Sequence, residues 1–183
     1  QYYYSSYALH DDINPFFIRL EKAFKEKMDL NPDVYGQLKW VHFDPKQPDL
    51  APDGPVDMVL TFRNVHNWAK AGTAESMFAG FSRALKPGGI LGLVEHRAKP
   101  GTPLDEQIRS GYMTVDYVVQ MAKKAGFRLD ASSEINANAK DTKDHKGGVW
   151  NLLPNLRNVA DEDKVRISGI GESDRMTLRF VKK

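Results

Sequence analysis

The sequence predicts an α/β fold built around a mainly parallel β-sheet with an antiparallel strand at its C-terminal end. Short apolar runs alternate along the chain with segments of helical periodicity, as they do in βαβ units. The last segment, residues 175–183, instead alternates apolar and polar side chains, which is typical of a strand with one exposed face. The 183 residues, 41% of them hydrophobic, are enough for one core, so we expect a single domain over 1–183.

Five further strands are expected from runs rich in apolar, β-branched or aromatic residues. They cover residues 1–9, 37–44, 56–62, 90–96 and 127–135. The run "VDMVLTF", residues 56–62, is almost continuously apolar, which predicts a strand buried on both faces, as in a parallel sheet.

Three segments have the apolar spacing of amphipathic helices, residues 13–28, 74–85 and 114–125. Asp11 or Asp12 is the expected N-cap of the first helix and Thr114 that of the third. A Pro-Gly-Gly turn should connect the second helix to the next strand. Residues 137–174 are polar and are expected to form a long loop with a short helix near 161–167.

The composition excludes several kinds of site and partner. The chain has no cysteine, so disulfides, zinc–thiolate sites and cysteine nucleophiles are excluded. A formal net charge of +2 is too small to indicate nucleic acid or an anionic membrane surface. No apolar run approaches the roughly 20 residues that a membrane span needs. We therefore expect neither a nucleic acid nor a membrane as partner.

Polar side chains follow three of the predicted strands, where an open α/β sheet binds its ligands. They are Asp44 after the second strand, Arg63, Asn64, His66 and Trp68 after the third, and Glu95 and His96 at the end of the fourth.

The order of these segments and their amino-acid sequences resemble those of class I S-adenosylmethionine-dependent methyltransferases, which have a Rossmann-like fold. The resemblance covers almost the whole chain and rests on "VDMVLTFRNVHNW", "FSRALKPGGILGLVEH" and "VVQMAKKAGFRL". The phrases "EHRAKPGT", "SEINANAKDTKDHKGGVW" and "GESDRMTLRF" resemble more specifically a group of uncharacterised bacterial predicted methyltransferases.

The resemblance implies a sheet in the order third, second, first, fourth, fifth, seventh, sixth strand. The family's first strand and its glycine-rich cofactor loop have no counterpart here, so the opening strand corresponds to the second. Without the first strand, buried backbone groups of the second and fourth strands would lack partners, at about 1–3 kcal/mol each. We expect that strand to lie upstream in a longer parent protein. The alternatives are another segment or a second copy of the chain in its place, or direct pairing of the two strands.

The resemblance also implies roles for the polar residues. Asp44 would contact the cofactor adenine, and Arg63 and Asn64 would line its methionine part. His66 and Trp68 would face the substrate. The alternatives are an Asp-Pro turn at Asp44, a helix cap at Asn64 or His66, and a core position for Trp68.

Glu95 and His96 offer a carboxylate and an imidazole at one strand end. His96 or His66 is the candidate general base, because the pKa of histidine lies near neutrality, and Glu95 is assigned to substrate binding. The alternative is that both residues are simply polar side chains exposed at the end of a strand. Adjacent residues of a strand point to opposite faces, so Glu95 and His96 need not act together.

Two polar stretches near the C-terminus allow competing interpretations. Asp141, Asp144 and His145 carry donors for a divalent metal, but their spacing matches no strong metal signature, so a solvated loop is favoured and no metal is assigned. Trp150 would cover the substrate pocket or fix the loop. The segment "GESDR", residues 171–175, favours an internal ion pair.

The resemblance implies transfer of a methyl group from S-adenosylmethionine to a small molecule in the intact parent, in the cytoplasm, where the donor is made. Residues 1–183 alone would be inactive, and an exported parent is the alternative location. A methyltransferase-like binding or scaffold domain without catalysis is the second hypothesis. Another nucleotide-binding enzyme, such as a dehydrogenase, is the third, and the antiparallel ending and "LKPGG" argue against it.

Overall fold

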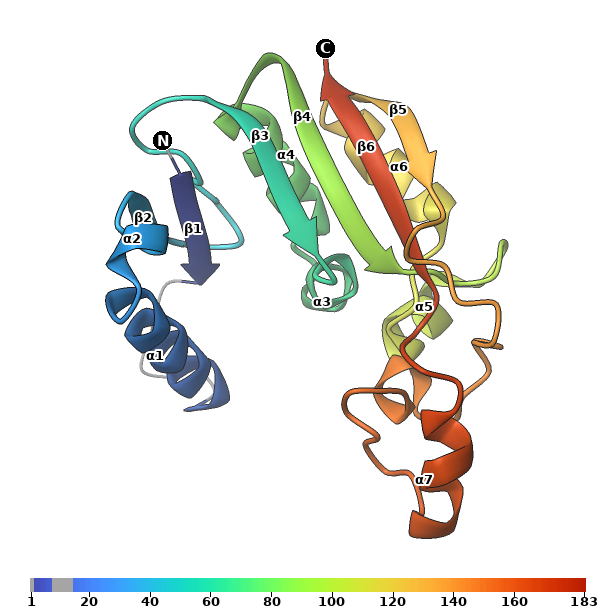
Figure 1. The fold of residues 1–183 in the computed structure, drawn as a ribbon. Helices are drawn as coiled ribbons and strands as arrows, with labels where there is room; N and C mark the ends of the chain where they lie inside the picture. Colours follow the sequence, from blue (N-terminus) through green and yellow to red (C-terminus); the bar gives the residue numbers. More distant parts are fainter. Residues whose placement is uncertain (1, 8–14) are drawn as a thin grey trace.

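The strands form two separate sheets in the computed structural model, which describes residues 2–7 and 15–183 (Figure 1). The first sheet pairs β1 (Tyr2–Tyr7) with β2 (Leu38–Phe43) in parallel. The second has the order β3-β4-β6-β5, and its strands are β3 (Val56–Phe62), β4 (Leu85–His96), β6 (Arg175–Lys182) and β5 (Phe127–Ser133). β3 and β4 are parallel, and β6 is antiparallel to both of its neighbours. This is the expected strand order, interrupted at the position of the family's first strand.

Seven α-helices and one 3-10 helix connect the described strands. They are α1 (Pro15–Asp29), α2 (Pro32–Tyr35), α3 (Val65–Ala71), α4 (Ala74–Ala84), α5 (Leu104–Ser110), α6 (Val115–Lys124), η1 (Gly148–Asn151) and α7 (Asp161–Ser168). α4 and α6 cover one face of the four-stranded sheet, and the main core lies between them and the sheet (Figure 1).

Local sequence signals account for several of these elements. The Thr114 side chain accepts a hydrogen bond from the backbone N–H of Tyr117 at 3.2 Å, so it caps α6 as predicted. Gly126 ends the following turn with φ of 89°, a conformation that favours glycine. The short helix near residue 161 is present as α7. The predicted caps Asp11 and Asp12 lie outside the described residues, and α5 was not predicted.

The prediction that β3 is buried on both faces is wrong. Met58, Leu60 and Phe62 are 53%, 57% and 56% exposed. Alternate residues of a strand point to one face, and these three lie on the face opposite α4. Among the described residues no helix covers that face (Figure 1). An apolar run shows that a strand can be buried, but it does not show what buries it.

The predicted Pro-Gly-Gly turn lies within β4. This strand begins at Leu85, which pairs with Val56, and the register shifts before Met58 pairs with Ile90. Gly88 has φ of 76° in this irregular part, so glycine relieves the strain of an inserted bend.

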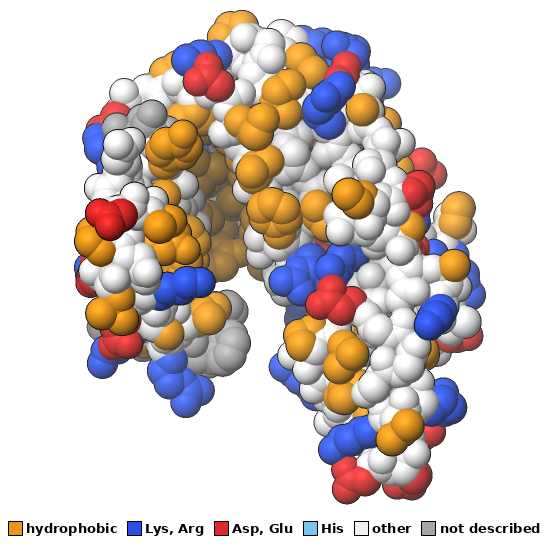
Figure 2. All heavy atoms as spheres, viewed as in Figure 1, with side chains coloured by type: hydrophobic (Ala, Val, Ile, Leu, Met, Phe, Trp, Pro, Cys, Tyr) orange, Lys and Arg blue, Asp and Glu red, His pale blue; other side chains and the backbone are white. Residues whose placement is uncertain are grey.

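A groove separates the two sheets. It has a volume of about 1060 Å³ and is lined by all of β1 on one side and all of β3 on the other. Figure 2 shows it as a hollow with hydrophobic side chains on its walls. Within the described part of the chain, β1 pairs only with β2 and β3 only with β4. The direct pairing of β1 with β3, one of the alternatives above, does not occur.

Phenylalanines on the covered and on the exposed side of β3 should contribute differently to stability. Phe78 on α4 is fully buried, and Phe78→Ala should lower the free energy of unfolding by about 3–5 kcal/mol because it leaves a cavity in the core. Phe62→Ala removes the same side chain at an exposed position and should cost less than about 1 kcal/mol. Urea denaturation of residues 1–183 measures both. Equal losses would show that the groove face of β3 is covered in solution.

Candidate active site

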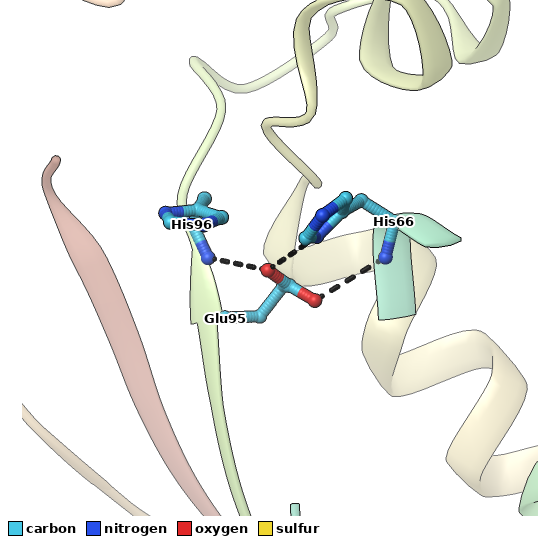
Figure 3. Close-up of side chains that lie close together, drawn as sticks. All are labelled: His66, Glu95 and His96. Atoms are coloured by element: carbon cyan, nitrogen blue, oxygen red, sulfur yellow. Dashed lines mark hydrogen bonds and ion pairs between the residues drawn. The ribbon is translucent and has the colours of Figure 1, made fainter. Parts of the chain in front are cut away.

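His66 and Glu95 form a buried hydrogen-bonded pair at the carboxyl ends of β3 and β4 (Figure 3). His66 Nδ1 lies 3.0 Å from Glu95 Oε1, and the backbone N–H of His66 donates to Glu95 Oε2 at 3.2 Å. The backbone N–H of His96 donates to Oε1 at 2.8 Å. Glu95 is 0% exposed and His66 is 7% exposed, so solvent competes little with these bonds.

The fold places the two side chains together through strand periodicity and a tight connection. Leu91 and Leu93 point into the core, so Glu95 falls on the same face of β4. Arg63 follows β3 with φ of 58°, and its N–H donates to the carbonyl of Val94 at 2.7 Å. This bend starts α3 against the end of β4 and brings His66 onto the carboxylate.

The contacts of Glu95 do not favour the substrate-binding role predicted for it. It was assigned to substrate binding, but its oxygens are buried and accept hydrogen bonds from His66 and from the backbone of His96. Each of its oxygens already accepts a backbone N–H, from His66 or from His96, so the carboxylate acts as a hydrogen-bond acceptor on both sides. An ionised carboxylate only accepts, so the hydrogen of His66 lies on Nδ1 and Nε2 carries the lone pair. Glu95 thus holds the His66 ring through Nδ1 and leaves Nε2 able to accept a proton.

His96 lies beside this pair in a different environment. Its ring centroid is 5.3 Å from that of His66, and its Nδ1 is 2.5 Å from Ser173 Oγ. The pKa of His96 is lowered to about 2, chiefly by burial and then by the neighbouring side chains of His66, Arg175 and Arg63. His96 is therefore a neutral imidazole at physiological pH.

Two aromatic rings border the imidazoles. The ring centroid of Trp150 is 6.1 Å from that of His66, and the ring centroid of Tyr112 is 6.4 Å from that of His96, both edge-on. Trp150 also packs against the small apolar cluster that contains Tyr112. The contact with His66 is consistent with both roles considered for Trp150, covering the pocket and fixing the loop.

The sequence analysis favoured a solvated loop around Asp141, but the Asp141 side chain is buried. Asp141 is 4% exposed and accepts hydrogen bonds from Tyr112 Oη and from the backbone N–H of Asp174. The ring of His145 also contacts it, at 3.0 Å, whereas Asp144 is exposed. Burial, then the neighbouring Asp141, raises the pKa of Tyr112. The Asp141 carboxylate thus joins the Tyr112 hydroxyl to the backbone of the segment before β6. This network holds the loop in place beside His96.

Asp174 connects the same loop to the end of β4. It pairs with Arg97 at 2.9 Å and with Lys143 at 2.7 Å. The predicted ion pair within residues 171–175 also forms, between Arg175 and Glu172.

Asp174 predicts an acid-sensitive contribution to stability. Burial raises the pKa of Asp174, but hydrogen bonds from Arg97 and Lys143 outweigh it and lower the value to about 2. A lowered carboxyl pKa stabilises the fold above the unfolded value near 4, and this stabilisation is lost as the pH falls towards 2. Asp174→Asn should cost about 3 kcal/mol at pH 7 and progressively less below pH 4.

Urea denaturation at pH 7 and pH 3 checks this prediction, with the exposed Asp49→Asn as control. A loss for Asp174→Asn that does not change between the two pH values would contradict it.

His66, Glu95 and His96 are also the described residues best placed to hold a metal ion. They offer one ligand atom each, and these atoms lie within 4.8 Å of one another. Both Glu95 oxygens already accept N–H donors, however, and Arg175 is the strand partner of His96. A cation would have to displace these hydrogen bonds beside a positive charge, so we assign no metal to this cluster.

The remaining predicted site residues lie around the sheet edge. Asp44 is exposed and accepts a hydrogen bond from the backbone N–H of Lys46 at 2.8 Å, as expected for the Asp-Pro turn. Arg63 is exposed. Asn64 precedes α3 without a side-chain cap bond and lines the groove. Trp68 is 4% exposed and donates its indole N–H to Tyr7 Oη at 2.8 Å, which favours the core role.

Ser173, Tyr112 and Asp141 were not singled out as site residues that act together. Ser173 and Asp141 lie in a polar stretch without periodicity, and Tyr112 precedes a helix. Their contacts join residues 29 to 77 positions apart. Two signals touched these residues, and neither indicated their contacts: Asp141 was considered as a metal ligand, and "GESDR" indicated ion pairs.

Comparisons with solved structures show the fold. An O-methyltransferase family 2 protein from Planctomyces limnophilus, in complex with apigenin, has a TM-score of 0.54 and 12% identity, covering 88% of this chain and 41% of that one. The O-methyltransferase NcsB1 of neocarzinostatin biosynthesis, with S-adenosyl-L-homocysteine and 1,4-dihydroxy-2-naphthoic acid, has a TM-score of 0.52 and 11% identity, covering 88% and 39%. The [4+2]-cyclase SpnF has a TM-score of 0.56 and 15% identity, covering 84% and 61%.

The chain thus has the Rossmann-like fold found in S-adenosylmethionine-dependent methyltransferases and spans less than two thirds of these three structures. No protein-family model matches the sequence, and the comparison with curated proteins gives no match. None of the helices in the described ranges is long and apolar enough to cross a membrane.

Proposed function

We propose that this chain is the larger part of a bacterial S-adenosylmethionine-dependent methyltransferase that acts on a small-molecule acceptor in the cytoplasm. The observation that carries the proposal is the His66–Glu95 pair, a buried base with an orienting carboxylate at the ligand-binding edge of a methyltransferase-like sheet.

The proposed reaction is a direct displacement. A lone pair of the acceptor atom forms a bond to the methyl carbon while the bond from that carbon to sulfur breaks. The positively charged sulfonium thereby becomes a neutral thioether. The proton of the acceptor passes to His66 Nε2, and Glu95 stabilises the imidazolium through the hydrogen bond to Nδ1. The remaining contribution of the protein is to align donor and acceptor.

We propose that the cofactor lies at the groove edge of β3, with Arg63 and Asn64 beside its methionine part and Asp44 beside its adenine. The groove itself would receive a parallel strand and a glycine-rich turn that residues 1–183 do not contain. Both bordering strands have a free edge towards it among the described residues, and most of the side chains that line it are apolar. A strand there would join the two sheets into one.

The exposed stripe of Met58, Leu60 and Phe62 supports the same proposal. It adjoins the groove on the face of β3 opposite α4, where a helix following the inserted strand would cover it. We propose that residues 1–183 alone are inactive for this reason. The strand would come from a complementing N-terminal segment, with a second copy of the chain as the alternative source.

A binding or scaffold domain without catalysis is the second candidate. The fold alone does not separate it from a methyltransferase, because one fold serves several functions and the [4+2]-cyclase SpnF has a similar fold. The test incubates the full-length protein with methyl-labelled S-adenosylmethionine and a panel of small phenols, enols and amines. Transfer that disappears in His66→Asn supports the methyltransferase. Cofactor binding without transfer to any acceptor would favour the second candidate.

A further inference from the structure

We infer that the site holds its two imidazoles in opposite tautomers, His66 with a bare Nε2 and His96 with a protonated Nε2, and that this pair recognises a hydroxyl group. The tautomers follow from the contacts of the two rings alone. The assignment of that hydroxyl to the methyl acceptor rests on the proposed function.

The contacts of the Ser173 hydroxyl fix the tautomer of His96. Ser173 is 3% exposed, and in the described part of the chain His96 Nδ1 is the hydrogen-bond partner of its Oγ. If Nδ1–H donated to Oγ, the hydroxyl hydrogen would be buried without an acceptor, which costs free energy. Ser173 therefore donates to Nδ1. A neutral imidazole that accepts at Nδ1 carries its hydrogen on Nε2.

His66 has the opposite arrangement. Its Nδ1 faces the Glu95 carboxylate, which cannot donate, so Nδ1 carries the hydrogen and Nε2 is the acceptor. The two rings, 5.3 Å apart, thus present one hydrogen-bond acceptor and one donor at the carboxyl edge of the sheet.

A hydroxyl group is the complement of such a pair, because it donates one hydrogen bond and accepts another. It would donate to His66 Nε2, which is the path of the proton in the proposed transfer, and accept from His96 Nε2–H, which holds the oxygen. A carboxylate would face the lone pair of His66, and an ether has no hydrogen to give. The aromatic rings of Trp150 and Tyr112 beside the imidazoles suit a planar phenol.

Both imidazoles are largely covered, with His66 7% and His96 9% exposed. Trp150 lies against His66 and is only half-buried, so it is the side chain whose displacement would admit the ligand. Ser173 has no part in contacting the ligand. It is a positioning residue that acts through His96.

Nitrogen NMR of histidine-labelled protein tests the tautomers without cofactor or acceptor. We expect His66 to show a protonated Nδ1 and a bare Nε2, and His96 the reverse, at pH 7. Ser173→Ala should move His96 towards the Nδ1–H form and leave His66 unchanged. Ser110→Ala is the matched control, since this buried serine donates to the carbonyl of Glu106 instead. The same tautomer in both rings, or no response to Ser173→Ala, would overturn the inference.

Titration of the same samples with phenol, anisole and benzoate tests the recognised group. Phenol should shift the Nε2 signals of both rings, and anisole and benzoate should need concentrations on the order of tenfold higher or more. Equal responses to phenol and anisole would overturn the hydroxyl assignment. Because no methyl transfer is measured, a failure here is separate from a failure of the proposed reaction.

Discussion

His66→Asn should lower the rate of methyl transfer by the proposed parent methyltransferase by about 10²–10⁴-fold, because it removes the proposed general base. The asparagine retains a side-chain N–H that can donate to Glu95, so the fold should be preserved. The loss should appear in kcat more than in KM, since the proton moves only in the transition state.

The matched control is His42→Asn. His42 also contacts a carboxylate, Glu21, at 2.8 Å, but it lies on β2 and is exposed. Initial rates with labelled S-adenosylmethionine measure both variants. If His66→Asn retained activity within about threefold of the control, His66 would not be the base.

Glu95→Ala should lower the free energy of unfolding by about 3–5 kcal/mol and abolish transfer as well. The substitution leaves the backbone N–H groups of His66 and His96 buried without their acceptor and also removes the partner of the His66 ring. Urea denaturation at pH 7 measures the stability, and the rate of transfer the activity.

Glu134→Ala is the control for this change. The Glu134 carboxylate also accepts hydrogen bonds, from Arg97, but its side chain is 68% exposed, so its removal should cost less than about 1 kcal/mol. Losses of equal size at the two positions would contradict the role assigned to Glu95.

The positions of the strands could be predicted from the sequence because they depend on local signals. The β-rich runs, the Thr114 cap and the "LKPGG" phrase are each read within a few residues, and the resemblance supplied the order of the strands. The burial of β3 could not be predicted, because the side chains of Met58 and Phe62 are the same whether or not another element covers them.

The site could be predicted only as a set of residues. His66, Glu95 and His96 were identified from their places after strands, but the pairing of His66 with Glu95 depends on the bend at Arg63 and on the face that β4 presents. The contact between Ser173 and His96 joins residues 77 positions apart, and no local pattern reports it.

The most direct test of the account is a calorimetric titration of S-adenosylmethionine into two proteins. One is residues 1–183, and the other is the same chain with a strand, a glycine-rich turn and a helix from a known methyltransferase fused ahead of Tyr2. If the groove is the place of the cofactor-binding strand, residues 1–183 should bind the cofactor weakly or not at all, and the fusion should bind it tightly. Equally tight binding by residues 1–183 alone would contradict the account.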